Sequence, residues 1–110
     1  MTHTDTYGYP TLAQAAPQAQ LLLQLVTGGA DPSLTLNDKV KSAHTVLSFA
    51  LSLGFPHDHA ATADQQVAFQ ALSDYACKQN GMEAVPVGAI NWKAIIQLVL
   101  AFLGTLVSGN

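Results

Sequence analysis

The chain has 110 residues, of which 49% are hydrophobic and only 10% charged, so it is one domain in length and too apolar for a disordered protein. Four lysines, no arginine and seven acidic residues give a net charge of −3. This balance excludes the dense basic surface that binding to nucleic acid requires.

We expect residues 1–10 to form a flexible arm, because this segment is polar and rich in threonine. Tyr7 and Tyr9 are the two residues with which the arm could hold a neighbouring surface. Residues 11–110 are expected to form a single helical domain.

The first predicted helix covers residues 11–27, with its firm part beginning near Ala16 so that Pro17 lies in the first turn. Gly28 and Gly29 should end it. Apolar residues at helical spacing should form its buried stripe: Leu21, Leu22, Leu25 and Val26.

The second predicted helix covers residues 35–53, with Thr35 or Asn37 as the N-cap and Gly54 at the end. Its inward seam is expected to follow spacings of four and three: Leu36, Val40, Ala43, Leu47 and Ala50. Residues 55–59 are expected to form a linker.

The third predicted helix covers residues 63–79, with Thr62 and Gln65 forming a capping box. Residues 82–89 are extended and apolar without a period. They could supply one short strand, but no second strand is predicted with which it could pair.

The fourth predicted helix runs from Trp92 to about Val107, with Asn91 as its cap. Its apolar residues lie on every side, and Lys93 is the only charged residue between positions 84 and 110. One interpretation is that this is the central helix of the bundle, with the other helices packed around it. A bundle of this size does not easily bury one helix on all sides, however, so we expect part of this helix to remain exposed and to contact a partner. The predicted contact residues are Trp92, Ile95, Val99, Phe102 and Leu106.

His57 and His59, with Asp64 or His44 as a third ligand, are the only candidates for a metal site, and a solvated turn is the simpler interpretation. Cys77 is expected to be a packed or half-exposed structural thiol, since it lies late in a predicted helix. The chain has no phosphate-binding loop, nucleophile elbow or zinc-protease motif, so we expect no enzyme and no cofactor.

The predicted fold is all-α, a small bundle of three or four short helices preceded by the extended arm. The function expected from the sequence is that of a structural or interaction protein, which packs into a larger assembly by self-association or on another protein. The alternative is a small membrane-associated protein that inserts residues 85–107.

Overall fold

A computed structural model describes residues 9–54 and 58–108 and contains four α-helices in an all-α bundle. The helices are α1 (Leu12–Thr27), α2 (Leu36–Leu51), α3 (Ala63–Gln79) and α4 (Trp92–Ser108). Two strands of three residues each, β1 (Asp58–Ala60) and β2 (Ala89–Asn91), accompany them. The predicted fold class is therefore confirmed.

Threonine capping boxes begin the first three helices. In each box the threonine hydroxyl accepts a hydrogen bond from a backbone N–H three residues later, and the side chain there accepts one from the threonine N–H. The pairs are Thr11 with Gln14, Thr35 with Asp38, and Thr62 with Gln65. The box predicted at Thr62 and the cap predicted at Thr35 are confirmed.

Helix α1 begins earlier than predicted, and Pro17 lies inside it rather than in its first turn. Proline has no N–H, so the carbonyl of Ala13 lacks its usual partner four residues later. The capping box at Thr11 supports this start. The predicted stripe is only partly correct, because the buried residues of α1 are Ala15, Ala19 and Leu22.

The strand prediction was wrong about pairing, since β1 and β2 form an antiparallel ladder with His59 opposite Ile90. The predicted linker, residues 55–59, overlaps β1 at Asp58 and His59. A three-residue strand is too short to show the alternation by which strands are recognised. The ladder fixes the chain just before α4.

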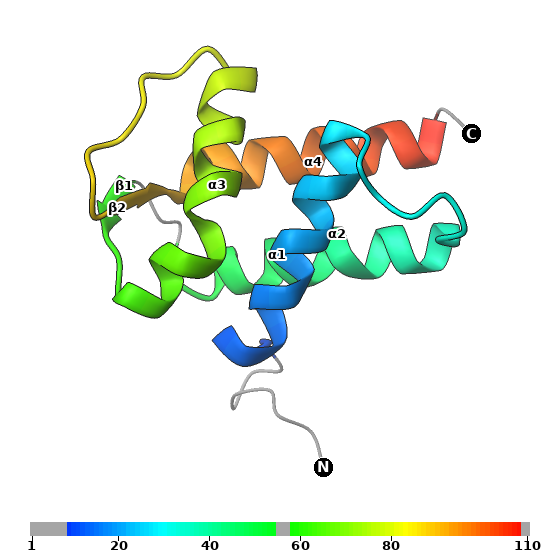
Figure 1. Cartoon of the computed structure of the whole chain (residues 1–110), viewed down its shortest axis with the longest axis horizontal. Helices are drawn as coiled ribbons and strands as arrows, with labels where there is room; N and C mark the ends of the chain where they lie inside the picture. The colour runs from blue at the N-terminus through cyan, green and yellow to red at the C-terminus, as the bar shows by residue number, and fades with distance from the viewer. Residues whose placement is uncertain (1–8, 55–57, 109–110) are drawn as a thin grey trace.

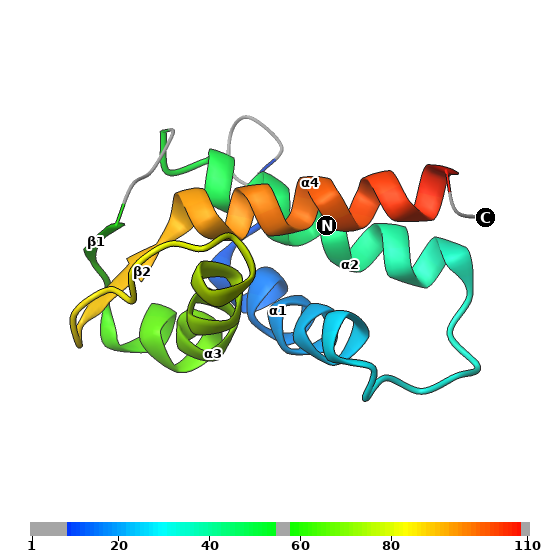
Figure 2. The same cartoon turned by 90° about the horizontal axis from the view of Figure 1, so that it is seen from above.

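The four helices form two crossed layers (Figures 1 and 2). Helices α2 and α4 run antiparallel side by side in one layer, and α1 and α3 cross them on one face. The first turn of α2 therefore lies beside the last turns of α4. Both of these ends project beyond α1 (Figure 1).

Three aromatic rings form the centre of the core between the layers. The rings of Phe49 and Phe69 are stacked, with centroids 5.3 Å apart, and the Trp92 ring lies 5.0 Å from Phe69 and 5.8 Å from Phe49. These distances are typical of favourable aromatic pairs. The core thus joins α2, α3 and the start of α4.

Two hydrogen bonds fix the helices to one another away from this aromatic cluster. The buried Ser42 hydroxyl donates to the Gln18 carbonyl (2.9 Å), which ties α2 to α1. The Tyr75 hydroxyl donates to the Val26 carbonyl (3.1 Å), which ties α3 to the end of α1.

The buried side of α2 is rotated from the predicted seam. Its buried residues are Ser42, Ala43, Val46, Phe49 and Ala50. Leu36 and Val40 are instead 59% and 37% exposed. The predicted seam did not include Ser42, whose hydroxyl can be buried because it is hydrogen-bonded to the Gln18 carbonyl.

Most of the predicted N-terminal arm lies outside the described residues. Of its ten residues the structure describes Tyr9 and Pro10, and both are half-buried.

Candidate interaction surface

Two asparagines form hydrogen bonds with the first turn of α4: Asn91, which precedes the helix, and Asn80, at the end of α3. The Asn91 Oδ1 accepts a hydrogen bond from the Ala94 N–H (2.9 Å), which is the predicted cap. The Asn91 N–H in turn donates to the Ser73 hydroxyl (3.0 Å), and the Asn80 side chain donates to the Ala94 carbonyl (3.3 Å). The first turn of α4 is therefore fixed to α3.

Three of the five predicted contact residues on α4 belong to the core. Trp92, Ile95 and Val99 have no exposed surface. A side chain enclosed by its own chain cannot meet a partner, so the prediction is wrong for these three. Sequence periodicity did not distinguish the inward side from the outward side, because both are apolar.

The other predicted contact residues are less enclosed. Phe102 and Leu106 are half-buried, one and two turns beyond Val99. Tyr9 is half-buried, and Tyr7 lies outside the described residues. A contact role for these four remains a prediction.

A second line of residues runs along α4 beside its core-facing residues, and one of them, Ile96, packs partly against the core. We call it the outer stripe: Lys93, Ile96, Leu100, Gly104 and Val107. Leu100 is 54% and Val107 85% exposed, Lys93 and Gly104 are exposed, and Ile96 is half-buried. With 3.6 residues per turn, these spacings of three and four keep all five on one side of the helix.

Helix α2 also carries exposed aliphatic residues. Leu36 and Val40, in its first two turns, are 59% and 37% exposed. The N-terminal end of α2 lies beside the C-terminal end of α4 (Figures 1 and 2).

The sequence does contain a signal for the outer stripe that the prediction did not use. Lys93 and Gln97 are the polar residues in the first half of α4, and they lie on its outward side. A lysine rarely becomes fully buried without a partner charge, so its position indicates which side faces solvent.

Elsewhere in the described part of the chain, two further aliphatic side chains are more than 80% exposed. Val67 on α3 is 82% exposed, and Val87, in the segment before β2, is fully exposed. Single exposed aliphatic residues are ordinary on protein surfaces. We therefore assign no contact to either of them.

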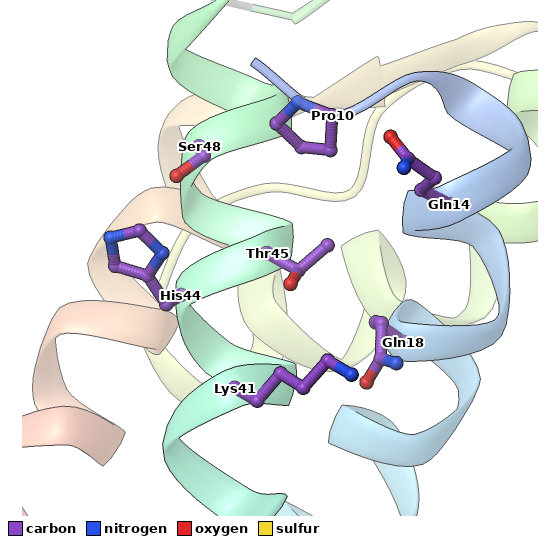
Figure 3. A pocket seen from close by; sticks show the side chains of 7 residues that line it. All are labelled: Pro10, Gln14, Gln18, Lys41, His44, Thr45 and Ser48. Atoms are coloured by element: carbon purple, nitrogen blue, oxygen red, sulfur yellow. The ribbon is translucent and has the colours of Figure 1, made fainter. Parts of the chain in front are cut away.

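A polar hollow of about 410 Å³ lies between α1 and α2 (Figure 3). Its lining residues are Pro10, Gln14, Gln18, Lys41, His44, Thr45 and Ser48. Lys41 is the one lysine of this lining, and it extends toward Gln18. The hollow is open to solvent and contains no carboxylate, so the lining residues lack a general acid–base pair of the carboxylate type.

The histidine cluster is only partly within the described residues. His57 lies outside them, and of His59 the structure describes the backbone position in β1. Among the described residues no three His, Cys, Asp or Glu side chains gather as a metal site would require. His44 is exposed on α2, and Cys77 is buried, 2% exposed.

Comparison with known proteins finds no matching family model, no similar curated protein and no similar solved structure. The function is therefore argued from the surface alone.

No helix in the described part of the chain has both the length and the apolar character needed to cross a membrane. The segment of the predicted insertion, residues 85–107, is not one helix, since β2 precedes α4 within it.

Proposed function

We propose that this protein is a non-enzymatic interaction protein that packs into a larger assembly through the outer side of its C-terminal helix, α4. The observation that carries this proposal is the exposure of Leu100 (54%) and Val107 (85%) on a helix that also supplies Trp92, Ile95 and Val99 to the core. Exposing such side chains to water costs free energy, about 25 cal/mol for each Å² of apolar surface.

The rigidity of α4 supports the same role. Its inward residues pack in the aromatic core and its first turn is hydrogen-bonded to α3. The outer stripe is thus presented on a preorganised element, and a partner need not order it on binding.

The test is crosslinking in the cell that makes the protein. A photoreactive residue at position 100 should produce covalent protein adducts, and the same residue at the control position 67, equally aliphatic and exposed on α3, should not. Equal yields at the two positions, or adducts with lipid alone at position 100, would overturn the proposal.

A further inference from the structure

The outer stripe of α4 is complementary to itself. Leu100 stands at its middle, with Ile96 four residues before and Gly104 four residues after, and with Lys93 and Val107 seven residues to either side. A Cβ at Gly104 would meet no atom within 4 Å, so space lies above this position. We propose that the stripe binds the same stripe of a second copy of this chain, with the two α4 helices antiparallel and crossing at Leu100.

This inference rests on the proposed function and names its partner. A two-fold axis at Leu100 brings each Ile96 opposite the partner's Gly104 and each Lys93 opposite the partner's Val107. The branched side chain of Ile96 then enters the space above the partner's Gly104, which has no side chain. This allows the two helices to approach closely. One patch used by both copies in this way is the ordinary arrangement of a symmetric dimer.

Charge decides the direction of the two helices. Lys93 lies in the first turn of α4, and the last turn has no basic residue to offset the negative end of the helix dipole. Antiparallel packing places each lysine at the negative end of the partner helix. It also separates the two lysines by about 21 Å, since seven residues on each side of the crossing rise 1.5 Å each.

A parallel arrangement would bring the two ammonium groups together at one end. Their separation would then fall below the screening length, which is about 8 Å at physiological ionic strength. The antiparallel arrangement therefore fits the charge on α4.

Engineered cysteines test the crossing directly, because the native Cys77 is buried and reacts slowly. Under mild oxidation Leu100→Cys should form a covalent dimer. Val107→Cys alone should not, because its two copies lie about 21 Å apart by the same helical rise and a disulfide joins Cα atoms about 4.4–6.8 Å apart. A mixture of Lys93→Cys and Val107→Cys chains should form the mixed dimer.

Val67→Cys is the control for random collision and should form no covalent dimer. Dimers of Val107→Cys at the yield of Leu100→Cys would overturn the antiparallel crossing. If Leu100→Cys forms no covalent dimer although circular dichroism shows that the chain is folded, the crossing at Leu100 would also be overturned.

Sedimentation of the unmodified chain separates this inference from the proposed function. A dimer is expected. Gly104→Leu should raise its dissociation constant at least tenfold, because the leucine side chain fills the space that the partner's Ile96 would occupy. Ala101→Leu, exposed but outside the stripe, is the matched control and should change the dissociation constant of the dimer less than twofold.

A wild-type monomer at every concentration would overturn the second copy as partner, while protein adducts at position 100 in the cell would still support the proposed function. Binding of the monomer to phosphatidylcholine vesicles would instead indicate a lipid surface and would also overturn the dimer.

Discussion

Trp92 and Leu100 lie eight residues apart on α4, and their environments are opposite. The Trp92 ring is enclosed and packs against Phe49 and Phe69, whereas Leu100 is 54% exposed. Hydrophobicity therefore does not distinguish the exposed Leu100 from the core residue Trp92. The two differ in how far their truncation lowers the free energy of unfolding.

Trp92→Ala should lower the free energy of unfolding by about 3–5 kcal/mol, because truncating a buried aromatic residue leaves a cavity. Leu100→Ala, the control, should change it by no more than about 0.5 kcal/mol as a surface substitution. Urea denaturation followed by far-ultraviolet circular dichroism measures both, since Trp92 is the only tryptophan and fluorescence would be lost. Equal effects of the two substitutions, measured on dilute protein, would contradict the placement of Trp92 in the core.

Asp31 gives a pH-dependent prediction at the turn between α1 and α2. Hydrogen bonds from the backbone N–H of Ser33 (2.9 Å) and from its hydroxyl (2.8 Å) lower the pKa of the Asp31 carboxyl. The stabilisation is present above the unfolded-state pKa and is lost as the pH falls through the lower folded-state pKa. Ser33→Ala should raise the pKa toward its ordinary value, as measured by NMR titration, and an unchanged pKa would show that the hydroxyl does not contribute.

At the scale of the elements, helix boundaries could be predicted because they depend on residues close in sequence. Thr35 and Thr62 bond to residues three positions later, and Gly28 ends α1 with a φ of +87°, a conformation that costs glycine little. The pairing of β1 with β2 depends on residues about thirty positions apart. Nothing local to either strand indicates that contact.

The same distinction explains which part of the candidate site could be predicted. The composition of α4 indicated that some of its surface would stay exposed, since one charged residue in this helix leaves apolar residues on every side. Which side is exposed depends on where α2 and α3 pack against α4, and this is a property of the tertiary packing. The sequence pattern therefore predicts Trp92, Ile95 and Val99 as contact residues although they belong to the core.

Pro17 offers a test of helix α1. Pro17→Ala would supply the missing N–H to the Ala13 carbonyl, so the free energy of unfolding should rise. The gain should be about 1–2 kcal/mol, less than the ~3 kcal/mol propensity difference, because alanine also gives the unfolded chain more freedom. Thermal unfolding measures the change, with the exposed Gln20→Ala as control, and a lower melting temperature for Pro17→Ala would contradict a continuous α1.

At the scale of the whole molecule, the C-terminal end of α4 projects beyond α1, which lies in the other of the two crossed layers (Figure 1). The projecting end of α4 and the first turns of α2 gather exposed apolar residues at one end of the bundle (Figures 1 and 2). A chain with few charges has limited means to keep such a surface in water, and burying it in an assembly removes this cost.

The most direct measurement of this account is the rate at which a thiol reagent modifies Leu100→Cys at increasing protein concentration. Rapid modification in dilute protein, slowing as the concentration rises, is the predicted result, while Val67→Cys should react at one rate throughout. Modification of position 100 that is as slow as that of the buried Cys77 in dilute protein would show that the chain covers this residue itself, and would contradict the account.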